Sequence, residues 1–311
     1  MNLAKTNITQ KIKEKALELG FNGVGIARAE KLNGFAEALK AWLAKGYHAE
    51  MDYMARNQEK RSDPTELVPG VKSVISLITS YYPAPLQNPG YPQIAKYAYG
   101  TDYHFVLKDR MKELWKYLEV MFPDLDGRIF VDSAPVSDKL WAVKAGLGWL
   151  GKNSCLINKE IGSFVFISEM LVNVELAYDE PYASNFCGSC TLCIDACPTQ
   201  AIVQPGVIDS RRCISYQTIE NKTDSIDERL KGTFSNRIFG CDICQDVCPW
   251  NKKPIITSVE EFKPSDSFLM LDSDAWNTMD ESAFNQLFKK SALKRAKLKG
   301  MQRNLRFVQS E

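Results

Sequence analysis

Apolar positions recur along the first half of the chain with two different periods. Residues at helical spacing predict amphipathic helices over 6–19, 34–45 and 104–121. Short apolar runs bounded by turn residues predict strands over 24–27, 71–81 and 128–131. A further helix is predicted to start near Val136 and to end at Gly146. The first half is therefore expected to mix helices with strands.

Two further predictions concern the chain after that helix. Residues 155–157 and 163–174 are predicted to form a β-hairpin. Thr278 and Glu281 have the spacing of a capping box, and apolar residues at helical spacing follow them. A helix is therefore predicted to begin at this box.

Charge is balanced over the whole chain but segregated toward its end. The sequence holds 39 basic and 38 acidic residues, so we expect no bulk attraction to nucleic acid or to a membrane. Residues 259–281 hold seven acids and one lysine, whereas residues 289–306 hold eight Lys or Arg and no acid. Leucines interleave with these basic residues, which predicts a docked helical element with one basic face. That face is either simply solvated or a contact surface for a polyanion.

Length and the N-terminal residues limit the class of protein. A chain of 311 residues is long enough for about two domains. The first 16 residues lack the apolar core of a secretory signal, and no twin arginine stands near them. The most apolar region, 162–174, is interrupted by Glu169 and is too short to span a bilayer. We expect a cytoplasmic monomer that does not associate with membranes.

Eight of the nine cysteines form two runs between residues 187 and 248. The first run has the C-x2-C-x2-C-x3-C-P spacing of bacterial ferredoxins, in which the fourth cysteine of each run ligates the other cluster. This rule predicts two 4Fe–4S clusters. The ligands of the first are Cys187, Cys190, Cys193 and Cys248. The ligands of the second are Cys213, Cys241, Cys244 and Cys197.

Zinc and disulfides are the alternatives for these cysteines. Zinc ribbons use paired CxxC ligands, which leave the x3-Cys-Pro ending of both runs unexplained. Disulfides need an oxidising compartment and a secreted chain. The ninth cysteine, Cys155, lies apart among apolar residues, and we interpret it as a buried structural thiol rather than a catalytic one.

Asp132 and Ser133 follow the predicted strand 128–131 and precede Pro135. An acid at the carboxyl end of an apolar strand stands where α/β proteins place catalytic groups. The same residues can instead cap the next helix, with Pro135 in its first turn. Both interpretations stay open from the sequence.

Two other stretches carry weaker signals. Three glycines surround Trp149 in residues 146–151, which indicates a close approach of the backbone to a flat or bulky group. His104, at the start of a helix, is more typical of a hydrogen-bonded structural residue than of a ligand.

Taken together, these motifs closely resemble those of epoxyqueuosine reductases. The resemblance runs from about residue 11 to residue 304. The stretches that carry it, beside the two cysteine runs, are residues 131–135, 146–153, 213–220 and 291–295.

The resemblance implies an α+β fold. Its first part is an N-terminal cobalamin-binding domain of α/β sandwich type, related to the reductive dehalogenases, over residues 1–178. A bacterial two-cluster ferredoxin-like domain is expected over 179–256. A short helical segment with a basic face is expected over 257–311.

The resemblance also implies a reaction and its cofactors. Epoxyqueuosine at the wobble position of tRNAs for His, Asp, Asn and Tyr is reduced to queuosine, in the last step of queuosine synthesis. Electrons from an external donor pass through two 4Fe–4S clusters to cobalamin, and Asp132 donates a proton to the departing oxygen. For this role the Asp132 carboxyl must be protonated at working pH.

Further site residues follow from the same resemblance. The expected cobalamin contacts are Arg56, Tyr97, Asp132, Trp149, Gly151, Ser163, Ser215, Glu220 and Asp242. The expected tRNA contacts are Gln217, Lys294, Arg295 and Lys297. A modified base in an anticodon loop is single-stranded, so it can enter a pocket without melting a duplex.

Two other functions remain as alternatives. A small-molecule reductase like the reductive dehalogenases uses the same cofactors but has no need of a basic segment. A non-catalytic iron–sulfur electron-transfer module predicts no corrin binding and a dispensable Asp132. A flavin or nicotinamide enzyme is disfavoured, because the phosphate-binding glycine fingerprints are incomplete.

Overall fold

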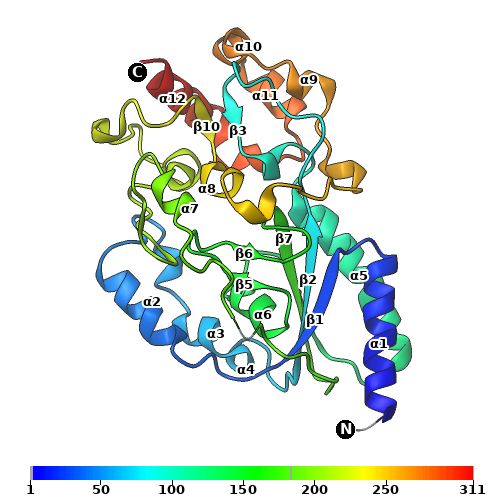
Figure 1. The fold of residues 1–311 in the computed structure, drawn as a ribbon. Coiled ribbons are helices and arrows are strands. Elements are labelled where there is room, and N and C mark those ends of the chain that lie inside the picture. Colours follow the sequence, from blue (N-terminus) through cyan, green and yellow to red (C-terminus); the bar gives the residue numbers. More distant parts are fainter. Residues whose placement is uncertain (1–2, 183, 311) are drawn as a thin grey trace.

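A four-stranded antiparallel sheet organises the first half of the chain. Its strands lie in the order β1-β2-β7-β4, with bounds Gly23–Arg28, Ser73–Ser80, Val165–Val172 and Gly127–Phe130. The computed structural model describes residues 3–182 and 184–310, and every residue of β2 is buried in it. The burial is complete because β1 and β7 flank β2 and helices cover both faces of the sheet (Figure 1).

The two faces of the sheet carry different helices. α1 (Leu3–Glu18) and α5 (Tyr103–Met121) cover one face, where Ile12, Leu107 and Ile75 share a core. α6 (Asp138–Lys144) covers the other face, where Trp141 and Val74 share a second core. Burying such side chains contributes roughly 1.5–3 kcal/mol each, which holds the layers together. The remaining helices of this part are α2 (Phe35–Ala44), α3 (Gln58–Ser62) and α4 (Pro64–Leu67).

The predicted helices and strands of the first half are confirmed within a few residues, but the predicted hairpin is wrong. β6 (Leu156–Ile157) pairs with β5 (Trp149–Leu150) and not with β7. Both edges of β7 are occupied by β2 and β4. The segment before β7 therefore has to find its partner elsewhere, and a single bridge between Asn158 and Gly162 closes the connection.

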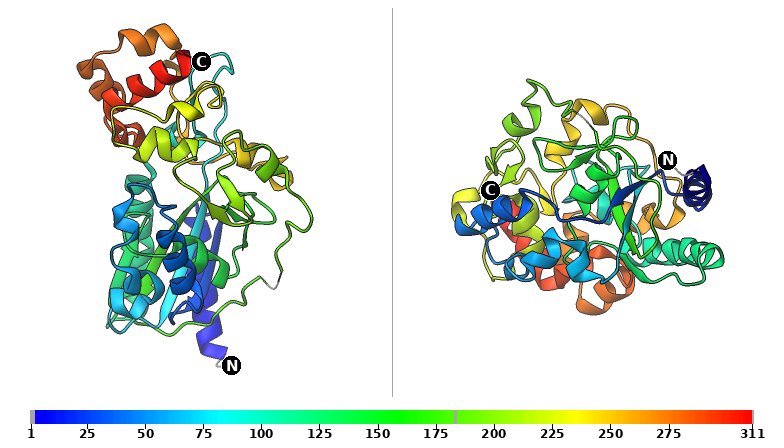
Figure 2. Two further views of the ribbon diagram at one scale, coloured as in Figure 1. Left: turned by 90° about the vertical axis from the view of Figure 1, so that its left-hand side faces the viewer. Right: turned by 90° about the horizontal axis from the view of Figure 1, so that it is seen from below.

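The second half is built from short elements around a separate core (Figure 2). Their bounds are α7 Leu192–Asp195, β8 Ile202–Gln204, β9 Val207–Ile208, a π-helix Tyr216–Glu220, β10 Arg237–Phe239, α8 Ile243–Asp246, α9 Asp266–Leu269, α10 Ser273–Thr278, α11 Glu281–Leu287 and α12 Lys297–Gln309. β3 (Gln93–Ile94), from the first half, pairs with β10 in parallel. The segment after β2 therefore crosses into the second core, where Ile94 and Tyr99 are buried.

The helix predicted after Thr278 is present as α11, but the predicted capping box is wrong. Asp280 caps α11, and its carboxylate accepts a hydrogen bond from the Ala283 N–H at 2.8 Å. Thr278 ends α10 instead, and its hydroxyl donates to the Asp274 carbonyl. A carboxylate is well suited to a helix N-terminus, because its charge complements the helix dipole.

The basic segment docks as a helix, as predicted. α12 buries Leu298, Met301 and Leu305 in the second core. Across residues 3–182 and 184–310, no helix has both the length and the apolarity that a bilayer crossing requires.

Arg303 and Asn304 of α12 point inward and bind the backbone of the π-helix region. The Arg303 guanidinium donates to the carbonyls of Gln217 (2.8 Å), Asn221 (2.9 Å) and Thr223 (2.6 Å). The Asn304 amide donates to the carbonyl of Thr218 at 2.9 Å. These side chains therefore hold the π-helix and the turn that follows it against α12. Arg303 is one of the eight basic residues of 289–306, but its side chain is buried against this backbone and is not part of a basic face.

We expect Arg303→Ala to lower the free energy of unfolding by about 3 kcal/mol, because three carbonyls, that of Gln217 buried and the other two partly buried, lose a charged donor. Urea denaturation measures this loss. Arg306→Ala is the matched control, since Arg306 is exposed on the same helix and should change stability by less than about 0.5 kcal/mol. Equal stability of the two variants would contradict the bracing role.

Candidate active site

Four cysteines from two distant segments line one cavity. Cys187, Cys190, Cys193 and Cys248 border a space of about 250 Å³, together with Phe186 and Trp250. Burial raises the pKa of Cys193, and negative charge on Cys187 and Cys248 raises it further. Four thiolates this close repel one another, and bound iron removes that repulsion. The cavity therefore fits the predicted ligand set of a first cluster.

The remaining four cysteines of the two runs also lie near one another. Burial raises the pKa of Cys213, and Cys197 adds to the shift. Burial likewise raises the pKa of Cys241 to about 12, with Cys213 contributing. The pKa of Cys244 is raised by a hydrogen bond to Cys155 and by burial, and the charges of Cys241 and Cys213 raise it further. These neighbours are the members of the second predicted ligand set.

Cys155 contacts this second set. Its thiol hydrogen-bonds to Cys244, which lowers the pKa of Cys155 and raises that of Cys244. Cys155 is thus packed against a predicted cluster ligand.

The glycine-rich stretch approaches the chain's own backbone. A Cβ on Gly148 would lie 2.2 Å from the Ile157 carbonyl oxygen, so only glycine permits the pairing of β5 with β6. Lys152 donates to the carbonyls of Gly188 (2.7 Å) and Cys190 (2.9 Å), and Asn153 donates to the Cys244 carbonyl. Trp149, which packs against Trp250, is buried. This stretch therefore braces both cysteine runs.

Asp132 stands at the end of β4, and the capping interpretation is wrong. α6 begins at Asp138, with Ser137 as the residue before it, so neither Asp132 nor Ser133 caps it and Pro135 lies outside the helix. Asp132 has a left-handed backbone (φ 53°), which a residue with a side chain adopts only where its surroundings impose it. Its carboxyl is 62% exposed.

Two side chains at the start of α5 reach the Asp132 carboxyl. The Tyr103 hydroxyl donates to Asp132 Oδ2 at 2.6 Å, and the Tyr103 ring stacks on Phe166 at 4.2 Å. His104 Nε2 lies 4.0 Å from the same oxygen, while its Nδ1 lies 2.7 Å from Asp102, the cap of α5. The structural hydrogen bond predicted for His104 is confirmed, and it also orients the ring toward Asp132.

Charged and aromatic groups surround Asp132 on the side facing the cysteines. Burial raises the pKa of Tyr97, and Asp132, Asp242 and Glu220 raise it further, so Tyr97 lies within electrostatic reach of all three. Glu220 accepts two hydrogen bonds from the Arg295 guanidinium, at 2.9 and 2.7 Å. Glu220, an expected cobalamin contact, thus holds Arg295, an expected tRNA contact.

Arg61 and Tyr53 complete this surface. Burial raises the pKa of Tyr53 to about 12, with further contributions from Glu220 and Asp132. Arg61 donates to the Tyr53 carbonyl at 3.0 Å, but its buried Nε has no hydrogen-bond partner among the described residues. Tyr103, Tyr53 and Arg61 were not predicted, because helices and loops distant in the sequence bring them to Asp132.

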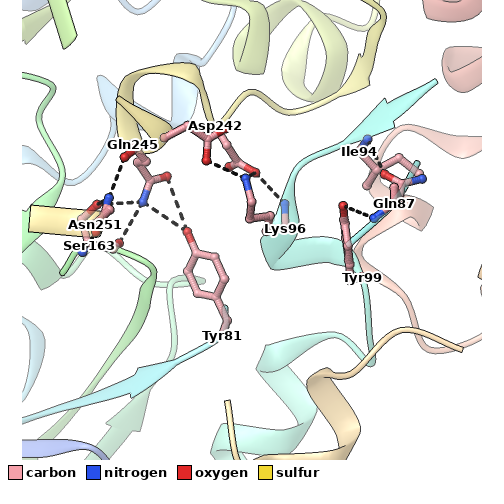
Figure 3. Close-up of polar contacts among 10 residues, drawn as sticks. Tyr81, Gln87, Ile94, Lys96, Tyr99, Ser163, Asp242, Gln245 and Asn251 are labelled. Atoms are coloured by element: carbon pink, nitrogen blue, oxygen red, sulfur yellow. Dashed lines mark hydrogen bonds and ion pairs between the residues drawn. The ribbon is translucent and has the colours of Figure 1, made fainter. Parts of the chain in front are cut away.

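Ser163 and Asp242, two of the expected cobalamin contacts, are engaged in polar contacts with the chain itself (Figure 3). The Gln245 amide donates to the Ser163 carbonyl at 2.8 Å and to its hydroxyl at 3.1 Å. Asn251 donates to the same hydroxyl at 2.9 Å. Asp242 accepts from the Lys96 backbone N–H at 2.8 Å, and the Lys96 ammonium is 3.4 Å from it. These contacts fasten the segment before β7 and the turn after β3 to the second cysteine run.

The other predicted residues differ in exposure. Arg56, Lys294 and Lys297 are exposed, whereas Gln217 is buried and donates to the Arg211 carbonyl at 2.7 Å. Ser215 lies against Cys213. Gly151 lies in the glycine-rich stretch, and its backbone hydrogen-bonds to Cys155 and Ser154. The structure thus brings Tyr97, Asp132, Glu220 and Arg295 together and leaves the exposed lysines at the periphery.

Two family models match parts of the chain. Residues 186–251 match one described as a 4Fe-4S double cluster binding domain. Residues 61–133, which end just past Asp132, match one described as epoxyqueuosine reductase QueG, DUF1730.

Whole-chain comparisons agree with these matches. An epoxyqueuosine reductase of Cyclobacterium marinum is 50% identical over 305 residues, covering 97% of each chain. A crystal structure of an epoxyqueuosine reductase with an epoxyqueuosine-modified tRNA-Tyr stem loop is similar with a TM-score of 0.88 and 28% identity, over 97% of this chain and 80% of that one. A Bacillus subtilis epoxyqueuosine reductase, with its catalytic loop swung out of the active site, has a TM-score of 0.89 and 28% identity, over 97% of this chain and 81% of that one. By identity and coverage, this protein belongs to the epoxyqueuosine reductase family.

Proposed function

We propose that this protein reduces epoxyqueuosine in tRNA to queuosine, with Asp132 as the proton donor. It is an oxidoreductase by its family. The observation that carries the proposal is the position of the exposed Asp132 carboxyl on a surface that Tyr97 and Asp242 connect to the second cysteine set. The reaction breaks both carbon–oxygen bonds of an epoxide, forms an alkene and releases water. It consumes two electrons and two protons.

The proposal includes the division of the chain. A cobalamin-binding part over 1–178, a two-cluster ferredoxin-like part over 179–256 and a helical segment over 257–311 account for the sheet, the cysteines and α12. The crossing of β3 into the second core links the first part to the others. This link would keep the clusters and Asp132 in a fixed relation.

The chain's residues fit both cofactors. Each cysteine set gathers four thiols, which is the ligand set of one 4Fe–4S cluster. For cobalamin, the surface around Asp132 offers the hydroxyl of Tyr97, the ion pair of Glu220 with Arg295 and the unpartnered Nε of Arg61, among the described residues. The amide side chains of a corrin need such hydrogen-bonding partners. When bound, cobalamin supplies a reducing cobalt centre at the substrate ring.

Asp132 holds and delivers the proton. Its exposed Oδ atoms can reach an oxygen leaving a substrate, and Tyr103 orients them through the 2.6 Å hydrogen bond. Stacking on Phe166 fixes the Tyr103 ring, so the hydroxyl points in one direction. The left-handed backbone of Asp132 keeps its side chain out of the sheet and aimed at the site.

The tRNA contacts belong to the proposal as well. The exposed Lys294 and Lys297 can grip phosphates without reading sequence. Arg295 joins them from its ion pair with Glu220. A direct contact by Gln217 requires it to release its hydrogen bonds to Arg211 and Asn221. We further propose a cytoplasmic monomer that acts on the tRNAs for His, Asp, Asn and Tyr and takes electrons from an external donor.

The function is tested with anaerobically reconstituted protein, a strong reductant and tRNA from cells that lack this activity. We expect mass spectrometry of the digested tRNA to show queuosine when cobalamin is supplied and not when it is omitted. Corrin binding without any queuosine would favour a small-molecule reductase. Intact clusters without corrin binding would favour an electron-transfer module.

A further inference from the structure

A buried glutamate lies in the centre of the sheet. Glu169 of β7 is 0% exposed, and it pairs with Ser76 on β2 and with Phe130 on β4. Neither of its carboxyl oxygens receives a hydrogen bond from a donor group in residues 3–182 or 184–310. An ionised carboxylate without donors in such a place carries a large desolvation cost. The proposed reaction gives Glu169 no role so far.

A second carboxyl explains the missing donor. Asp138, in the first turn of α6, lies within hydrogen-bonding reach of Glu169. Two carboxylates in contact cannot both ionise, whereas one proton between them satisfies both groups. Burial raises the pKa of both Asp138 and Glu169, and for Glu169 the charge of Asp138 adds to the shift.

The packing of α6 keeps Glu169 away from water, while Asp138 is half-buried at the edge of the helix. Gly25 lies in the same row of the sheet as Ser76 and Glu169, and a Cβ there would be 2.0 Å from the Ala145 carbonyl oxygen. The end of α6 therefore rests directly on the sheet. Trp141 and Ala142 are buried between them.

The pair adjoins the proton donor. Glu169 pairs with Phe130, which precedes Asp132 by two residues. Asp132 lies close enough to raise the pKa of Asp138, after burial, and it also acts on Glu169. The other charged groups that face Asp138 are Lys139 of α6, which lowers the pKa of Asp138, and Arg61 of α3. The carboxyls of Glu169, Asp138 and Asp132 thus lie within electrostatic reach of one another, from the sheet to the surface of the site.

We propose that Asp138 and Glu169 share one proton and deliver it to Asp132 during turnover. The inference rests on the proposed function. That reaction needs two protons: the first, from Asp132, leaves the cleaved oxygen as a hydroxyl group, and the second converts it to water. Asp132 carries only one proton. The shared proton reloads Asp132 while substrate covers it, and solvent later reprotonates the pair.

The relay is tested by single turnover of pre-reduced, cofactor-loaded protein on tRNA substrate at several pH values. We expect Glu169→Gln to slow queuosine formation roughly tenfold and to change its pH profile, because an amide cannot release a proton. Glu169→Asp keeps a carboxyl and should recover part of the rate. Ser168→Ala is the matched control, since Ser168 is a buried, unpartnered group on the opposite face of the same strand, among the described residues, and it should leave the rate unchanged.

A second readout is independent of activity. Because the folded pair keeps a proton that unfolded carboxyls lose above about pH 4, its contribution to stability falls as the pH rises through the raised pKa values. The free energy of unfolding, measured by denaturation, should therefore fall less with rising pH in Glu169→Gln than in the wild type. Infrared spectra at neutral pH should show a protonated carboxyl band that the variant lacks.

The outcomes separate the two proposals. An unchanged rate and pH profile in Glu169→Gln would overturn the relay while the reductase function stands. No queuosine from the wild type would remove the function, and the relay with it, even where the infrared band shows a shared proton. If Glu169→Gln does not fold, Asp138→Asn takes its place, and absence of the band from the wild type would overturn the shared proton directly.

Discussion

Asp132→Asn should lower queuosine formation by roughly 10²- to 10⁴-fold, the usual contribution of a positioned general acid. The asparagine side chain has the same size and still accepts a hydrogen bond from Tyr103, so the local geometry is kept. It has no proton to give to the departing oxygen. The rate of queuosine formation in single turnover, followed by mass spectrometry of digested tRNA, measures this loss.

A second variant should disturb the orientation of the Asp132 carboxyl and leave the carboxyl itself in place. Tyr103→Phe removes the 2.6 Å hydrogen bond and keeps the ring stacked on Phe166, so we expect a smaller loss than in Asp132→Asn. Iron content, corrin absorbance and tRNA affinity should match the wild type in both variants. If Asp132→Asn turned over at the wild-type rate, the proton would have to come from another group, and His104, 4.0 Å away, would be the next candidate.

Local sequence signals predicted the parts of this structure that local physics determines. Amphipathic periods located α1, α2 and α5, because one face of each helix must be buried. The failures arose where distant segments compete for one partner. Residues 155–157 precede β7 in sequence, but β2 and β4 already occupy both edges of β7.

The same limit applies to the site. The spacing of the cysteines predicted two sets of four, and the cavity formed by Cys187, Cys190, Cys193 and Cys248 agrees with the first set. Glu169, in contrast, only interrupts an apolar run in the sequence. Its contact with Asp138 cannot be predicted from that run, because Asp138 reaches it from a helix on the face of the sheet. The composition of residues 289–306 gives their basic charge, but it does not tell that Arg303 turns inward, because its three carbonyl partners come from the fold.

Cys248→Ser should abolish the first cluster and leave the second, although Cys248 belongs to the run that holds Cys241 and Cys244. The reason is spatial: Cys248 lines the cavity of Cys187, Cys190 and Cys193. A serine hydroxyl is a poor substitute for a thiolate on iron. We expect about half of the iron to be lost. Turnover with an external donor should then stop, because the electron path is interrupted.

The spectra of three cysteine variants distinguish exchanged fourth ligands from unexchanged ones. The electron paramagnetic resonance spectrum of reduced Cys248→Ser should match that of Cys187→Ser, from the other run, and should differ from that of Cys241→Ser. Cys155→Ser is the control: it changes a thiol that contacts Cys244, but all eight expected ligands remain, so the iron content should stay at the wild-type level. A Cys248→Ser spectrum that matched Cys241→Ser would mean that each run holds its own cluster. The exchange of fourth ligands, and with it the close coupling of the two clusters, would then be wrong.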